Sequence, residues 1–121
     1  MWIAAAAGFE VVTGAGLVVA PSLLARLLFG SEMNATGDLV ARISGLAMLC
    51  LALACWPRAF RATGRQTLTP LLALSLLAAV FLIYVGMRGV NVGALLWPAA
   101  AAHLVLATLL ARTWIAYDGM S

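Results

Sequence analysis

The sequence predicts an all-α membrane protein, in which four transmembrane helices form an antiparallel bundle and a short interfacial helix follows the first span. Hydrophobic residues make up 65% of the 121 positions, and charged residues only 9%. A water-soluble chain of this length could not bury so much apolar surface. Runs such as residues 71–77 do not alternate between apolar and polar residues, which favours helices over the strands of a membrane barrel.

Four long apolar stretches define the predicted spans, because a membrane-spanning helix needs about 20 mainly apolar residues. They cover residues 2–20, 39–56, 71–87 and 92–112, and we expect a single membrane domain over residues 1–121. The first stretch lacks the basic N-terminal region of a signal peptide and contains Glu10. We therefore expect it to be retained as a helix.

The segment after the first span is amphipathic and much too short to cross a bilayer. It covers residues 22–29, and Pro21 separates it from the first span. We expect it to lie in the membrane interface with Arg26 toward water. The face that we expect to contact acyl chains carries Leu24, Leu27 and Leu28. Gly30 is a suitable residue to end this helix.

Prolines and glycines mark the ends of the later spans. Pro57 is expected to stop the second span, and Pro70 to open the third, where its missing N–H costs nothing. The turn before the fourth span contains Gly89 and Asn91 and is very short. The third and fourth spans should therefore form a tight antiparallel hairpin.

Arg42 lies just inside the second span and has three potential partners. It can extend to lipid headgroups, pair with Asp38 four residues earlier, or reach inward toward the Tyr84 hydroxyl. We favour the headgroups.

The arginines indicate the orientation of the chain. Arg58, Arg61 and Arg65 fall in the loop between the second and third spans, which contains no acidic residue. Cytoplasmic loops are enriched in basic residues, so we expect this loop and both termini in the cytoplasm, with these three side chains on lipid headgroups. The net charge of +3 does not indicate a nucleic-acid partner, because the arginines lie at helix ends.

Glu10 is the most informative polar residue, because it lies about 12 Å from the inner end of the first span. A carboxylate at this depth is costly in lipid and usually faces the protein interior. Its helical face carries small residues such as Ala6, Ala7 and Gly14, which favour contact with another helix. Two interpretations remain: a functional carboxylate, or a structural carboxyl group that fixes helix packing.

His103 lies at a similar depth, about 14 Å from the inner end of the fourth span. Its face is also lined by alanines, so a contact between Glu10 and His103 is sterically reasonable. The pair would form a site for a proton or a ligand. The alternative is a hydrogen-bonded histidine that serves packing alone.

Five further side chains are predicted to line a pocket near this pair: Thr13, Cys50, Ser75, Tyr84 and Trp97. A set of Glu10, Cys50 and His103 would suit a metal ion in principle. The chain has a single histidine and no closely spaced ligand pair, so we predict no metal site.

The order of elements in the first half of the chain resembles that of DoxX-like small bacterial membrane proteins. In this sequence the order is Pro21, the segment 23–29, Gly30 and then Arg42-Ile43-Ser44-Gly45. The resemblance implies a four-helix bundle in the bacterial cytoplasmic membrane. It also implies a role as a subunit of a redox or quinone-linked membrane complex.

A shorter stretch, Ala7 to Val12, resembles the segment around the essential glutamate in the first span of small multidrug-resistance transporters. That resemblance implies proton-coupled export of cations through Glu10. The chain lacks the lysine that follows the first span in those transporters, and their aromatic and glycine-rich third span. We prefer the DoxX-like resemblance, because the order of elements fits it better.

The short loops leave no room for a soluble active site. We therefore expect a non-enzymatic accessory or scaffold subunit of a membrane complex, whose partners are membrane lipids and either other subunits or a second copy. No cofactor is predicted other than a quinone or lipid, with a quinone near His103, Tyr84 and Trp97 as one hypothesis. The alternative is a small proton-coupled transporter that uses Glu10 with His103.

Overall fold

The computed structural model describes residues 2–59, 65–89 and 92–118, with the side chains of residues 57–59, 65–67 and 117–118 left out. The described residues form five α-helices, which confirms the all-helical prediction. The helices are α1 (Trp2–Val19), α2 (Pro21–Phe29), α3 (Ala35–Ala59), α4 (Arg65–Arg88) and α5 (Leu96–Asp118).

Four of these helices contain segments that are long and apolar enough to cross a membrane. Within the described residues the segments are Trp2–Val19, Ala35–Trp56, Leu68–Arg88 and Leu96–Ala116. A helix satisfies its backbone hydrogen bonds internally, which is what a hydrocarbon environment demands of a spanning segment. The four segments indicate a multi-pass membrane protein.

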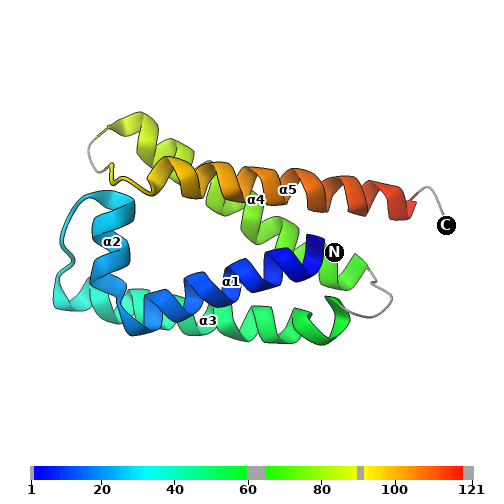
Figure 1. Ribbon diagram of the computed structural model, residues 1–121, viewed down its shortest axis with the longest axis horizontal. Coiled ribbons are helices and arrows are strands. Elements are labelled where there is room, and N and C mark those ends of the chain that lie inside the picture. Colours follow the sequence, from blue (N-terminus) through cyan, green and yellow to red (C-terminus); the bar gives the residue numbers. More distant parts are fainter. Residues whose placement is uncertain (1, 60–64, 90–91, 119–121) are drawn as a thin grey trace.

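The helices are arranged as two pairs joined by a short helix. Helix α1 packs along α3, and α4 packs against α5, while contacts between the two pairs are sparse (Figure 1). Helix α2 runs across one end of the molecule, from the α1–α3 pair toward α5 (Figure 1). Packing within each pair is thus much more extensive than packing between the pairs.

Two glycines allow α1 and α3 to approach closely. A Cβ atom built on Gly45 would lie 2.6 Å from the carbonyl oxygen of Gly14, and one built on Gly14 would lie 2.8 Å from that of Gly45. Contacts this short leave no space for a side chain on either residue. Small residues at helix crossings permit such backbone contact, which stabilises helix pairs in lipid.

Both ends of α2 are fixed by backbone geometry. Pro21 occupies the start of the helix, where its missing N–H has no helical partner to lose. Gly30 ends the helix with a φ of 64°, and its N–H donates to the Arg26 carbonyl at 2.9 Å. The last carbonyls of α2 accept bonds from the segment before α5: Gly93 N–H donates to Leu28 at 2.9 Å, and Leu95 N–H to Leu27 at 2.8 Å.

This docking explains why α5 begins later than the sequence predicts. The predicted span starts at Val92, whereas the helix starts at Leu96. The N–H groups of Gly93 and Leu95 are directed at α2 instead of forming a helical turn of their own. A Cβ atom on Gly93 would overlap the Leu27 backbone, so only glycine fits at this junction. At its other end α5 continues beyond Arg112 to Asp118.

The helices extend past the prolines that we expected to bound the second and third spans, although the apolar segment of the second span does end at Trp56. Helix α3 continues through Pro57 to Ala59, and α4 begins at Arg65, so that Pro70 lies inside the helix. Each proline removes one backbone donor. Both lie within two turns of a helix end, where the missing bond interrupts only a short stretch of helix.

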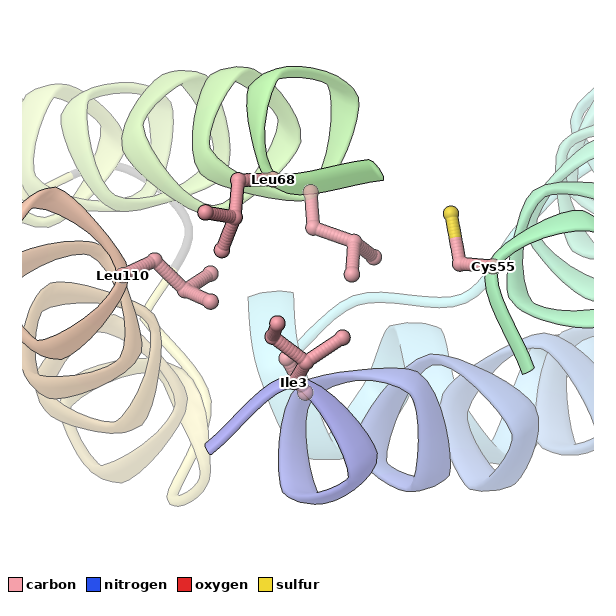
Figure 2. Close-up of a cluster of buried hydrophobic side chains, with 6 residues drawn as sticks. Ile3, Cys55, Leu68 and Leu110 are labelled. Carbon is pink, nitrogen blue, oxygen red and sulfur yellow. The ribbon is translucent and has the colours of Figure 1, made fainter. Parts of the chain in front are cut away.

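An apolar cluster closes the end of the molecule away from α2. Figure 2 shows Ile3 of α1, Cys55 of α3, Leu68 of α4 and Leu110 of α5 pointing toward one another. Ala6 and Leu71 complete the buried cluster. The first turn of α1 thus meets the late turns of α3 and α5 and the early turns of α4.

Gly45→Ala should destabilise the protein, because its new methyl group would press on the backbone of α1. Overpacking of this kind costs about 1–3 kcal/mol. Gly8→Ala is the matched control, since a Cβ atom there meets nothing within 4 Å and both substitutions gain similar helix propensity. Thermal unfolding in detergent measures the difference. Equal stability of the two variants would contradict the close α1–α3 contact.

Candidate functional site

Helices α1, α4 and α5 each present one buried polar side chain on an otherwise apolar inner face. These side chains are Glu10, Ser75 and His103. Along each helix they continue the three- and four-residue spacing of the buried apolar positions, which marks one helical face. The three polar groups therefore point to the space enclosed by the helices.

Counting from the apolar cluster gives the relative depths of the three groups. Glu10 lies seven residues after Ile3, and His103 seven residues before Leu110, so both are about 10 Å from the cluster. Ser75 lies seven residues after Leu68, which is the same distance of about 10 Å. Glu10, Ser75 and His103 thus share a level by this count, although the described residues form no hydrogen bond between Glu10 and His103.

The buried polar atoms have no hydrogen-bond partner within the described part of the chain. They are both carboxyl oxygens of Glu10, Oγ of Ser75 and Nδ1 of His103. Glu10 and Ser75 are fully buried, and His103 is 5% exposed. A buried polar group without a partner costs about 1–3 kcal/mol, and more when it is charged. The interior therefore has unused hydrogen-bonding capacity.

Phe9 connects α1 to His103. The Phe9 and His103 ring centroids lie 5.1 Å apart at an angle of 88°, an edge-on contact that is favourable for aromatic rings. Thr13 donates from its hydroxyl to the Phe9 carbonyl at 2.9 Å. The imidazole is therefore held against the turn of α1 that carries Glu10.

A cavity of about 410 Å³ lies beside His103, bounded by α1, α2, α4 and α5. Its volume falls in the range of roughly 300–1,000 Å³ that small-molecule sites occupy. Apolar side chains and two polar residues form its walls, namely Phe9, Val12, Thr13, Leu24, Leu27, Leu28, Leu82, Leu95, Pro98, Ala99, Ala102 and His103.

A second, open hollow of about 450 Å³ adjoins this cavity along α1 and α5. Its lining is apolar throughout and consists of Ala5, Phe9, Ala101, Ala102, Val105 and Leu106. Phe9 and Ala102 belong to both linings. The cavity and the hollow are thus neighbours, separated by these two side chains.

The leucines of α2 lie beside the cavity. Leu24, Leu27 and Leu28, which we expected to contact acyl chains, all line it, and Leu27 is also 36% exposed. The reason is that α2 bridges the two helix pairs, so its apolar face turns toward α1 and α5. Arg26 lies on the exposed side of the helix.

Not all of the predicted pocket residues meet at this site. Thr13 lines the cavity, and Ser75 is buried without lining it. Tyr84 and Trp97 are 56% and 50% exposed, and Cys50 is also exposed. Tyr84 instead lies beneath Arg88, whose guanidinium carbon is 5.8 Å from the ring centroid. The predicted grouping of His103 with Tyr84 and Trp97 is thus absent from the cavity lining.

Sequence reasoning missed the largest part of the cavity wall. The leucines of α2 and the residues Phe9, Pro98 and Ala102 were not predicted to line a pocket. One signal was present: Phe9 adjoins Glu10, and Ala99 and Ala102 lie four and one residues before His103. An aromatic ring and small residues beside a buried histidine favour a pocket next to it.

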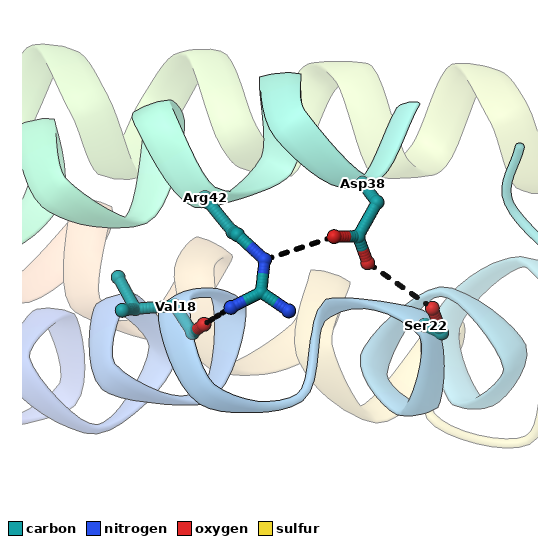
Figure 3. A network of polar contacts seen from close by, with 4 residues as sticks. All are labelled: Val18, Ser22, Asp38 and Arg42. Carbon is teal, nitrogen blue, oxygen red and sulfur yellow. Dashed lines mark hydrogen bonds and ion pairs between the residues drawn. The ribbon is translucent and has the colours of Figure 1, made fainter. Parts of the chain in front are cut away.

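Arg42 is bound within the protein. Its Nε donates to Asp38 Oδ2 at 2.8 Å, and its Nη1 donates to the Val18 carbonyl at 2.6 Å (Figure 3). Ser22 donates to the other Asp38 oxygen at 3.3 Å. Of the three partners that the sequence offers Arg42, the structure shows Asp38, and the Arg42 side chain remains 44% exposed. It joins the end of α1, the start of α2 and the start of α3.

The predicted headgroup contacts lie outside the described residues. Arg58 and Arg65 belong to α3 and α4 by their backbones, but their side chains are not described, and Arg61 is not described at all. In the part of the chain that the structure describes, no three His, Cys, Asp or Glu side chains are grouped to hold a metal ion.

Comparisons of the chain with protein-family models, with curated proteins and with solved structures found no match. The fold and the site together define a chain with four candidate membrane-spanning helices and, between its helix pairs, an apolar cavity beside His103.

Glu10→Met should leave the protein as stable as the wild type or stabilise it by up to about 3 kcal/mol, because an unpaired buried carboxyl group is removed. Thermal unfolding in detergent measures the effect. Asp38→Leu is the comparison: it removes a carboxylate that accepts two hydrogen bonds, and it should lower the stability. A marked loss of stability in Glu10→Met would mean that the carboxyl group has a structural partner.

Proposed function

We propose that this protein is a non-enzymatic accessory or scaffold subunit of a membrane complex, folded as an antiparallel four-helix bundle in the bacterial cytoplasmic membrane. The observation that carries the proposal is the small buried share of each span. Only 17–28% of the residues in the apolar window of each span are buried within the chain. The outer faces must be covered by lipid or by the helices of partners.

The contacts at the helix ends support the antiparallel bundle. Arg42 near the start of α3 bonds to Val18 at the end of α1, while Cys55 late in α3 meets Ile3 at the start of α1. Neighbouring helices would therefore run in opposite directions through the bilayer, as short connections require.

Helix α3 provides the best surface for a partner. It packs mainly against α1, and large apolar side chains on its other side are exposed: Leu39, Val40, Ile43, Leu46 and Leu53. Such a face suits packing against the helices of another subunit. The DoxX-like order of elements implies the same role.

The interior polar groups support a binding or structural role more than a catalytic one. Both carboxyl oxygens of Glu10, Oγ of Ser75 and Nδ1 of His103 have no hydrogen-bond partner within the described part of the chain. A nucleophile and its base would be expected within hydrogen-bond reach of each other. An apolar cavity beside a single histidine favours a quinone or a lipid as the ligand.

Purification from the native membrane in a mild detergent, followed by native mass spectrometry, tests the subunit role. We expect a stable complex with other membrane proteins, and loss of that complex when the gene is deleted. Recovery of the chain without partners, together with no change in any membrane complex on deletion, would contradict the proposal.

The proposed topology places both termini in the cytoplasm, because the loop between α3 and α4 contains Arg58, Arg61 and Arg65. A green fluorescent protein fused after residue 121 should therefore be fluorescent, and an alkaline phosphatase fused there should be inactive. Fusions within residues 31–34, between α2 and α3, serve as the control and should behave oppositely. An active phosphatase at the C-terminus would reverse the orientation.

A proton-coupled transporter is the second candidate, and the burial of Glu10 favours it. Both oxygens of this carboxyl group are unpartnered on the interior face, where the two helix pairs have few contacts. Such a group can exchange a proton for a ligand as the pairs move. A single bundle has little polar lining, so this function would require a homodimer.

Glu10→Gln tests the transporter candidate directly. In proteoliposomes, the wild type should show binding or uptake of an organic cation that depends on pH, and the variant should lose that pH dependence. Since glutamine preserves the size of the side chain, folding should not change. Identical pH profiles for the two proteins would exclude Glu10 as the coupling group.

A further inference from the structure

We propose that the cavity beside His103 binds a membrane-dissolved molecule made of an apolar chain and one neutral carbonyl or hydroxyl group. We also propose that this molecule arrives sideways from the bilayer, past Phe9. The inference rests on the proposed membrane location of the chain and deepens it, but it does not depend on a partner subunit.

The lining of the cavity selects an uncharged, largely apolar ligand. Apart from Thr13 and His103, every lining side chain is apolar, and none carries a permanent charge. Transfer of apolar surface into such walls is favourable, whereas a phosphate or carboxylate would lose its hydration without gaining a cationic partner. Ordinary phospholipid headgroups are therefore excluded.

His103 supplies the specific contact. It is 95% buried, it lines the cavity, and its Nδ1 has no partner in the described chain. A neutral imidazole has one donor and one acceptor nitrogen, and it can therefore bond either a carbonyl or a hydroxyl group. A ligand with such a group would gain a hydrogen bond to the imidazole as well as fill the space.

The depth of His103 supports the same ligand chemistry. It lies seven residues, or about 10 Å, from the start of the Leu96–Ala116 span. At that depth a phospholipid presents only its acyl chains, because its headgroup remains in the interface. A neutral polar group attached to an apolar chain can reach this level.

The adjoining hollow provides the route. Its apolar walls lie along α1 and α5, and it meets the cavity at Phe9 and Ala102. Ala101 and Ala102 leave space for a chain to lie against α5. A rotation of the Phe9 ring away from His103 would join the two spaces, and the leucines of α2 line the cavity on another side.

Photolabelling of the purified protein in lipid nanodiscs tests the proposal. The probe is a 16-carbon primary alcohol with a diazirine in its chain, and the labelled residues are mapped by mass spectrometry. We expect saturable labelling of cavity residues such as Phe9, Leu28 and Ala102. Non-saturable labelling spread over outward-facing residues such as Leu53 and Leu77 would overturn the proposal.

Two variants link the labelling to the cavity. Ala102→Leu fills the space shared by the cavity and the hollow, and His103→Leu removes the polar contact. Each should reduce saturable labelling by about tenfold, the size of effect that one lost hydrogen bond or a blocked site produces. Ala73→Leu, on an exposed position of α4, is the matched control and should label like the wild type.

Circular dichroism and size-exclusion chromatography show whether each variant is folded. Unchanged labelling in a folded Ala102→Leu protein would overturn the proposal.

Competition distinguishes the sources of the ligand. Displacement of the probe by a polyprenol or prenylquinone, and not by a diacylglycerol, identifies an isoprenoid ligand, and the reverse result identifies an acyl one. Both results support the proposal. If a fatty acid at alkaline pH displaced the probe as well as the neutral competitors do, the site would not select a neutral group, and this result would overturn the proposal. Because the isolated chain is used, failure here is distinguishable from failure to find partner subunits.

Discussion

Hydrocarbon offers no hydrogen bonds, and this constraint determines most of the structure. Every backbone group at membrane depth must find a partner within the protein. Where α2 ends, Gly93 and Leu95 donate to its last carbonyls, and where α1 ends, Arg42 donates to Val18. These bonds also hold α2 between the two helix pairs. The same requirement that caps the helix ends thus fixes how the pairs are joined.

Packing is unequal within and between the helix pairs, and the cavity follows from that difference. Gly14 and Gly45 bring the backbones of α1 and α3 into direct contact. Contacts between the pairs are few, with α2 at one end of the molecule and the apolar cluster at the other. The middle is left with an apolar space beside His103 and with polar groups that the described chain does not satisfy.

The membrane character and the buried polar residues could be predicted from the sequence, because both depend on local pattern and helical rise. Four apolar stretches indicate four long helices, and counting residues places Glu10 and His103 at one level. The direction of α2 could not be predicted, since the same amphipathic pattern suits a membrane interface and an interior cavity.

The rotation of each helix about its axis was equally undetermined. A shift of one residue decides whether Cys50 of α3 or Tyr84 of α4 faces inward. Only the packing of α3 against α1, and of α4 against α5, fixes that rotation. The continuation of α3 through Pro57 also depends on context that the residue type does not carry.

The meeting of α1 and α5 at His103 is the feature on which the site depends, and solid-state NMR in lipid bilayers measures it directly. The chain has one histidine and four phenylalanines, so selective labelling of both types gives an unambiguous histidine signal. With ring centroids 5.1 Å apart, Phe9 and His103 should give a cross-peak that disappears in Phe9→Leu. The absence of that cross-peak in the wild type, or its persistence in the variant, would contradict the arrangement of the two helix pairs around this site.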